Sequence, residues 1–129
     1  MYKVIERKTI LVEGGNVKRG LRLTDDSFVG FGELYFTEIE QNKVKGWKRH
    51  TKMTLNLLPV TGEIVLYIKR DLLDSPEEVR FGFDDYKLVS IEPNVWVAFK
   101  GIADVNLMAN LASIEHDPSE SETAPYCDD

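Results

Sequence analysis

Short apolar runs, separated by glycine, proline, asparagine and aspartate, follow one another along most of the chain. Eight runs are rich in valine, isoleucine, leucine and aromatic residues, as strands are: 3–12, 29–40, 44–58, 63–70, 79–83, 87–92, 95–100 and 106–114. Helix signals are scarce, and the only start, Ser75-Pro76-Glu77-Glu78, has room for about one turn. Many short strands with almost no helix predict an all-β sandwich or barrel.

The run over residues 44–58 alternates polar and apolar side chains, which point to opposite faces of a strand. The apolar face carries Trp47, Met53, Leu55 and Leu57, and the polar face carries Lys48, His50, Lys52, Thr54 and Asn56. We expect the polar row to face the lumen of a barrel, the alternative being a face turned to solvent. The lysines around His50 favour its neutral imidazole, the form that accepts a proton.

Other candidate side chains lie on neighbouring runs. Glu33 and Tyr35 share one face of the run 29–39, and each has a group that donates or accepts protons. The alternative for Tyr35 is a core position with a hydrogen-bonded hydroxyl. Trp96 is expected either in the core or at the rim, as a platform for a flat ligand ring.

Composition and charge divide the chain unequally. A length of 129 residues with 43% hydrophobic content suits one domain. The formal net charge is −6, and residues 115–129 contain six acidic residues and no basic one, so the rest of the chain is balanced. We therefore expect a barrel over residues 1–116 and a loosely ordered acidic tail over residues 117–129.

Basic residues concentrate between positions 41 and 62, a stretch that contains no acid. Such a stretch attracts an anionic ligand, although lysines on an exposed strand are the alternative. This stretch is too short, and the rest of the domain too close to neutral, to predict nucleic-acid binding, which requires a basic stripe across the domain.

The sequence also bears on location and cofactors. No apolar stretch approaches the roughly 20 residues of a membrane helix, and MYKVIERKTI lacks the apolar centre of a secretory signal, so we expect a cytoplasmic protein without membrane contact. One cysteine and two histidines argue against an internal disulfide and a metal cage. We expect no metal and no cofactor.

Two segments together resemble a known family. KGWKRHTKM followed by Gly62, and IEPNVWVAF followed by LASIEHDPSE, are similar to the sugar-nucleotide cupins, which include the dTDP-4-dehydrorhamnose 3,5-epimerases and the dTDP-4-keto-6-deoxyhexose 3,4-ketoisomerases. The resemblance covers residues 29–120 and implies a double-stranded β-helix, the jelly-roll cupin barrel, in a metal-independent homodimeric isomerase. An apolar face such as that of the run 44–58 would also need covering, which favours a homodimer.

The resemblance assigns roles to particular residues. The ketoisomerase motif Arg-Gly-Phe-His-Ala-His-Lys-Lys falls on residues 45–52, where His50 keeps the second histidine and Lys48 replaces the first. The assisting tyrosine of that family falls on Tyr35. Against the epimerases, His50 falls on the base and the acid falls near Glu115-His116, while their base-orienting aspartate belongs to a C-terminal stretch that we expect this chain to lack.

The implied reaction is proton transfer beside the C4 ketone of a dTDP-4-keto-6-deoxyhexose, in cell-surface polysaccharide biosynthesis. We expect His50 to remove the proton, Lys48 or Lys52 to stabilise the enolate, and Tyr35 or His116 to return the proton. The candidates for substrate binding are Lys52, Arg49, Asn56, Glu33 and Trp96.

One alternative is a catalytically silent nucleotide-sugar-binding cupin acting as a binding or regulatory module. Another is a metal-dependent oxygenase, which would need ligands beyond His50.

Overall fold

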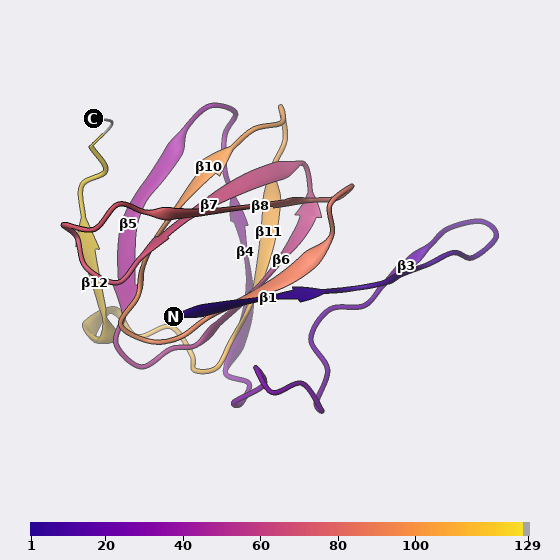
Figure 1. Ribbon diagram of the computed structural model, residues 1–129. Coiled ribbons are helices and arrows are strands. Elements are labelled where there is room, and N and C mark those ends of the chain that lie inside the picture. The colour runs from indigo at the N-terminus through magenta and orange to yellow at the C-terminus, as the bar shows by residue number, and fades with distance from the viewer. Residues whose placement is uncertain (128–129) are drawn as a thin grey trace.

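The computed structural model describes residues 1–127, which form a barrel of two facing antiparallel sheets (Figure 1). The first sheet has the order β1-β9-β6-β11-β4, and the second has the order β12-β5-β10-β7-β8. The strands of the first sheet are β1 (Tyr2–Glu6), β9 (Lys87–Ile91), β6 (Leu55–Thr61), β11 (Leu107–Ala112) and β4 (Glu33–Glu38). Those of the second are β12 (Ser121–Ala124), β5 (Val44–His50), β10 (Trp96–Gly101), β7 (Glu63–Lys69) and β8 (Glu77–Gly82). The prediction of an all-β fold is confirmed.

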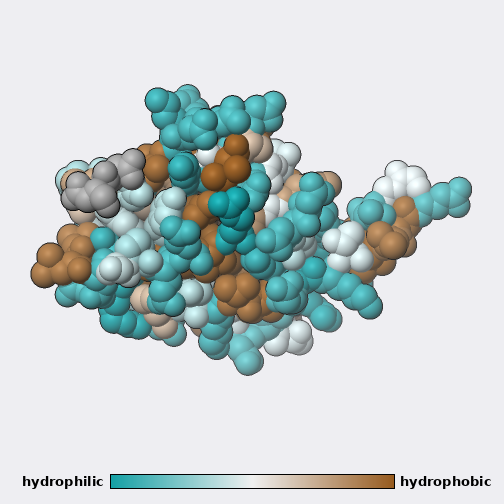
Figure 2. All heavy atoms as spheres, turned by 45° about the horizontal axis from the view of Figure 1, so that its top comes forward, coloured by the Kyte–Doolittle hydropathy of each residue, from teal (hydrophilic) through white to brown (hydrophobic). Residues whose placement is uncertain are grey.

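Two further strands form an arm outside the barrel. The strands β2 (Thr9–Ile10) and β3 (Val17–Lys18) pair with each other alone, and the hairpin extends away from both sheets (Figure 1). Apolar side chains remain exposed on this arm, among them Leu11 and Val17, and Figure 2 shows it as the projection with brown patches at the right.

The long run 44–58 is not one strand, which corrects our expectation. β5 ends at His50, residues 51–54 bend, and β6 begins at Leu55 in the opposite sheet. The alternation of faces is therefore interrupted, and Met53, Leu55 and Leu57 all lie in the core between the sheets. Trp47 is buried on the other face of β5, where its ring meets that of Tyr126. This apolar set is thus core, and it does not supply the surface on which we based a homodimer.

The helix start expected at residues 75–78 is also wrong. β8 begins at Glu77 and pairs with β7 from Ile68 back to Glu63. A turn of helix satisfies few backbone groups, whereas the ladder with β7 pairs the backbone of the whole segment. Among residues 1–127, the structure contains no helix with the length and hydrophobicity needed to span a membrane.

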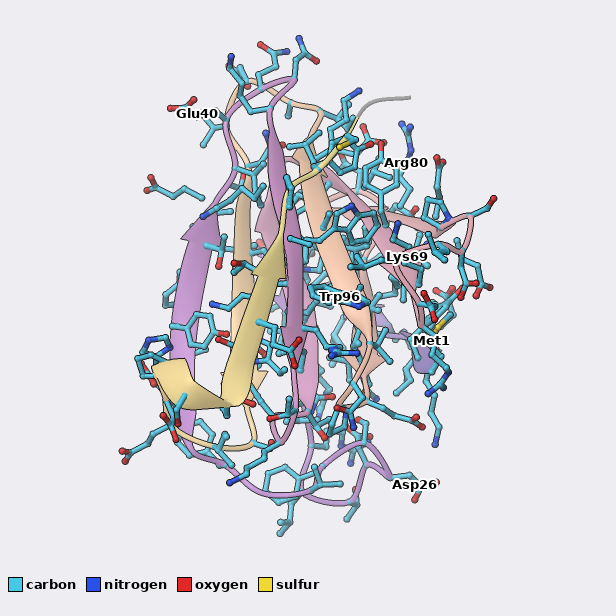
Figure 3. The ribbon with its side chains drawn as sticks, turned by 90° about the vertical axis from the view of Figure 1, so that its left-hand side faces the viewer. Met1, Asp26, Glu40, Lys69, Arg80 and Trp96 are labelled. Atoms are coloured by element: carbon cyan, nitrogen blue, oxygen red, sulfur yellow. The ribbon has the colours of Figure 1, made fainter. Side chains whose placement is uncertain are left out.

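The acidic tail is ordered where it follows the barrel, contrary to our expectation of a loose end. Asp117 caps the short 3₁₀ helix η1 (Pro118–Glu120) by accepting a hydrogen bond from the Ser119 amide. β12 follows at once and pairs with β5 along its whole length, as Figure 3 shows in yellow. The boundary expected at residue 116 therefore does not separate ordered from loose chain, while residues 128–129 of the predicted tail lie outside the described residues.

Candidate functional site

A cavity of about 170 Å³ lies between the two sheets. Its polar lining comes from three strands, with Lys45, Lys48 and His50 on β5, Tyr35 and Thr37 on β4, and Asn110 on β11. Its apolar lining consists of Leu55, Leu57, Val97, Phe99 and Met108. Of the five residues predicted to take part in the reaction, the structure thus brings together three, His50, Tyr35 and Lys48.

His50 is the last residue of β5 and is 7% exposed. Its Nδ1 forms a short hydrogen bond with Oε1 of Glu120, a carboxylate that is 4% exposed. A carboxylate on one ring nitrogen fixes the tautomer and the orientation of an imidazole. Nε2 makes no hydrogen bond to residues 1–127, so it is the nitrogen available to the cavity. His50 is therefore held by a carboxylate, where we had expected only lysines around it.

Glu120 is fixed in turn by the bend at residues 51–54. Its Oε2 accepts hydrogen bonds from the amides of Lys52 (3.0 Å) and Met53 (3.3 Å). Its backbone carbonyl accepts from the Thr51 amide at 2.8 Å and from Thr51 Oγ1 at 2.7 Å. The bend that interrupts the run 44–58 thus encloses the carboxylate that orients the histidine.

The surroundings of Glu120 favour its ionised form. Burial alone would raise the pKa of this carboxyl, but the hydrogen bond with His50 and the two backbone amides outweigh it and leave the pKa lowered. An ionised Glu120 accepts a hydrogen bond and donates none, so the Nδ1 facing it must carry the proton. The neutral imidazole then has its lone pair on Nε2, as a general base requires.

Tyr35 approaches the cavity from the first sheet, while His50 belongs to the second. Its hydroxyl oxygen accepts a hydrogen bond from Asn110 Nδ2 at 2.7 Å. Burial, chiefly, raises the pKa of Tyr35, and the hydrogen bond from Asn110 opposes the rise in part. The phenol therefore keeps its proton at neutral pH and is suited to donate it.

Two lysines give the cavity its positive charge. Lys48 lies two residues before His50, on the same face of β5, and Lys45 lines the same wall. Ammonium groups in a partly enclosed site stabilise an enolate or a phosphate oxygen. Lys45 belonged to the basic stretch recognised in the sequence but was not selected as a site residue. Residues 1–127 contain no group of three histidine, cysteine or acidic side chains that could hold a metal ion.

Arg49 and Trp96 lie outside the cavity, on the outer face of the second sheet. They are paired in the register of β5 and β10, and the Arg49 guanidinium lies 4.9 Å from the centroid of the Trp96 ring. Arg49 Nη2 also contacts both carboxylate oxygens of Glu122, at 3.0 and 2.9 Å. Successive side chains of a strand point to opposite faces. Because Lys48 and His50 point into the lumen, Arg49 between them points outward. The structure does not support substrate binding by this pair.

The remaining candidates are likewise placed elsewhere. Asn56 is buried, but its Nδ2 donates to the Ser27 carbonyl at 3.0 Å, away from the cavity. The Lys52 side chain is exposed, and only its backbone amide serves the site, by holding Glu120. His116 is exposed, and its amide donates to Glu33 Oε1 at 2.9 Å. None of these four expected side chains, Asn56, Lys52, His116 and Glu33, lines the cavity.

Besides Lys45, two residues of the site were missed by sequence reasoning. Glu120 was counted with the acidic tail, although Asp117-Pro118 before it has the form of a helix cap and first turn, which indicates an ordered segment. Asn110 stands between Ala109 and Leu111 in the middle of the run 106–114, and an amide between apolar residues of a strand signals a buried hydrogen-bonding role.

Comparisons with known proteins bear on the fold and on the family. No protein-family model and no curated protein matches the sequence. Among solved structures, a dTDP sugar isomerase from Desulfovibrio desulfuricans G20 is 37% identical to this chain with a TM-score of 0.87, and the match covers 96% of this chain and 83% of that one.

More distant structures share the architecture. QdtA, a sugar 3,4-ketoisomerase from Thermoanaerobacterium thermosaccharolyticum in complex with TDP, is 19% identical with a TM-score of 0.80, and the match covers 94% of this chain and 86% of that one. The 3,5-epimerase RmlC from Legionella pneumophila Philadelphia 1, in complex with dTDP-4-keto-L-rhamnose, is 16% identical with a TM-score of 0.81. That match covers 98% of this chain and 74% of RmlC. These likenesses establish the fold, and the expected jelly-roll cupin barrel is confirmed.

Proposed function

The chain belongs to the dTDP-sugar isomerases, and from this premise we propose that it transfers protons beside the C4 ketone of a dTDP-4-keto-6-deoxyhexose. The observation that carries the proposal is the buried pair of His50 and Glu120, whose free imidazole nitrogen faces a cavity. Burying a carboxylate is costly, and this one is oriented to hold a general base. A silent binding module would not need such a pair, so the pair favours the enzyme.

In the proposed reaction, His50 Nε2 removes the acidic proton from the carbon next to the ketone. Lys48, on the same wall, stabilises the negative charge that develops on the ketone oxygen. Tyr35 returns a proton from the facing sheet, to the opposite face of the same carbon in an epimerisation or to the neighbouring carbon in a keto transfer. Lys45 is the cation left to attract the diphosphate.

The rest of the lining supports a deoxygenated sugar. Five apolar side chains, Leu55, Leu57, Val97, Phe99 and Met108, make up the remainder of the wall. A methyl group gains from contact with such a wall, whereas a hydroxyl buried against it would lose its hydrogen bonds. We infer a 6-deoxy sugar on this ground. We also propose that the enzyme acts in the cytoplasm and, as the resemblance implies, that it serves the assembly of cell-surface polysaccharide.

Incubating the enzyme with dTDP-4-keto-6-deoxyglucose in deuterated water tests the proposal. We expect solvent deuterium to enter at least one carbon next to the ketone, because His50 exchanges the removed proton with solvent. NMR spectroscopy locates the deuterium and distinguishes an epimer from a 3-keto product. Incorporation no faster than in a matched His50→Ala sample would contradict the proposal, and tight binding without exchange would favour the silent module.

We also propose a homodimer, now on a different surface. β4 is an edge strand of the first sheet, and its outward residues Leu34 and Phe36 are exposed, as is Phe31 just before it. Phe31 and Phe36 are 61% and 57% exposed. An edge strand that carries large apolar side chains is poorly tolerated in an isolated protein, and a second copy of this chain would cover it.

Light scattering at micromolar concentration tests this assembly. We expect the mass of a dimer for the unaltered protein and that of a monomer for Phe36→Glu, because the charge would be buried at the interface. Leu73→Glu is the matched control, since Leu73 is 96% exposed in the loop between β7 and β8 of the other sheet. A monomeric unaltered protein, or a dimer that survives Phe36→Glu, would refute the assignment of this surface.

A further inference from the structure

We propose that Asn110 is the positioning residue that makes Tyr35 a proton donor, an inference that rests on the proposed function. Asn110 lies in the middle of β11, is 2% exposed and lines the cavity. Its strand pairs with β4, which carries Tyr35, and with β6. It stands directly opposite Tyr35 in the register of β11 and β4.

The orientation of the Asn110 amide follows from its partners. Its Oδ1 accepts a hydrogen bond from the backbone amide of Asn56 at 3.1 Å. A backbone N–H only donates, so the oxygen of Asn110 must face Asn56 and the nitrogen must face the other way. Nδ2 therefore donates to the Tyr35 hydroxyl oxygen at 2.7 Å and contacts Met53 Sδ at 3.9 Å.

This arrangement decides what the Tyr35 hydroxyl can do. Because its oxygen already accepts from Asn110, its own proton is free to be donated elsewhere. Within residues 1–127, the only acceptor recorded for that proton is Met53 Sδ at 3.8 Å, and a thioether accepts weakly. A substrate in the cavity would offer a better acceptor, and the Asn110 N–H would then stabilise the phenolate left behind.

Every proton in the proposed reaction is accounted for. One C–H bond next to the ketone breaks and its proton passes to His50 Nε2, leaving an enolate. One C–H bond then forms with the proton of Tyr35, which becomes a phenolate held by Asn110. In a keto transfer, the proton of the neighbouring hydroxyl also moves to the former ketone oxygen. His50 and Tyr35 recover their starting states by exchanging protons with solvent.

The variant Asn110→Asp reverses the hydrogen bond and is the direct test. One carboxylate oxygen still accepts from the Asn56 amide, but the other now accepts the Tyr35 proton and engages it. In deuterated water, deuterium exchange into the substrate reports the His50 step, and product formation reports the Tyr35 step. We expect the ratio of product formed to deuterium exchanged to fall by about 10²-fold, the scale of one proton-transfer group.

Two further variants keep the test decisive. Asn110→Ala removes the donor without adding charge. It should lower the same ratio about tenfold, which corresponds to the lower end of the free-energy range for a hydrogen bond to a charged group. Tyr35→Phe should lower it as much as Asn110→Asp, and the double variant no further, because both act on one proton. Circular dichroism identifies any variant that fails to fold.

The possible failures are distinguishable. If the unaltered enzyme exchanges no deuterium, the proposed function fails. If it exchanges deuterium and forms product, but the ratio in folded Asn110→Ala or Asn110→Asp equals that of the unaltered enzyme, only the role of Asn110 is refuted. An additive loss in the double variant would also refute it, because it would show that Asn110 does not act through Tyr35.

Discussion

Replacing His50 with asparagine will lower kcat/KM by about 10²–10⁴-fold, the contribution of one positioned general base. Asparagine is similar in size and keeps a polar partner for Glu120, but it has no nitrogen that accepts a proton at neutral pH. The same variant should lose deuterium exchange and product formation together, since both begin with removal of the proton. Steady-state rates and NMR exchange on one substrate measure the two effects.

The chain offers a matched control in its only other histidine. His116→Asn makes the same substitution at an exposed position outside the cavity, and we expect kcat/KM to stay within about twofold because surface changes have small effects. If kcat/KM fell equally in the two variants, the position of His50 in the cavity would not explain its effect. Full activity in folded His50→Asn would remove His50 from the mechanism.

The second large effect is expected from Glu120→Gln. The amides of Lys52 and Met53 will hold the oxygen of the new side chain, which turns its NH₂ group toward His50 Nδ1. An NH₂ donor at Nδ1 selects the tautomer with its proton on Nε2, which cannot then accept one from substrate. We expect kcat to fall on the order of 10³–10⁴-fold, as when an orienting carboxylate becomes an amide in the serine protease triad.

Thermal melting separates this catalytic effect from stability. Because the folded protein lowers the pKa of Glu120, its ionisation stabilises the fold at neutral pH, and that contribution disappears as the pH falls below the ordinary glutamate range, about pH 4. The gap in Tm between the unaltered protein and Glu120→Gln should therefore be widest near neutral pH and narrow in acid. A gap that widens in acid would contradict the assigned ionisation.

Glu122→Gln is the control on the same segment. Glu122 lies two residues further on, is half exposed and pairs with Arg49 on the outer face. Exposed ion pairs contribute about 0–1 kcal/mol, so this variant should keep both kcat and the pH dependence of Tm. Losses as large as those of Glu120→Gln would mean that docking of the segment matters, and not the carboxylate on His50.

The parts of the site that follow from local pattern could be predicted. Lys48 and His50 share a face of one strand because they are two residues apart, and the same rule places Arg49 opposite. The rule holds only within a strand, so it failed for Asn56 beyond the bend at residues 51–54. The bend at residues 51–54 carries no strong turn signal, since neither glycine nor proline marks it.

Contacts between distant segments could not be predicted from pattern. Glu120 lies 70 residues from His50 in the chain, and only the pairing of β12 with β5 brings it there. Asn110 and Tyr35 are 75 residues apart and meet through the register of β11 and β4. Charge composition even argued the wrong way, because it assigned Glu120 to a solvated tail.

Because β12 lies at the edge of its sheet, it is held less firmly than the strands inside the barrel. One neighbour, β5, holds this strand of four residues, whereas β5 itself lies between two strands. Fraying of an edge costs less free energy than unfolding a barrel. Each such opening would release Glu120 from His50 while both sheets persist. We therefore expect the upper temperature limit of catalysis to be set by one short strand and not by the barrel that surrounds the substrate.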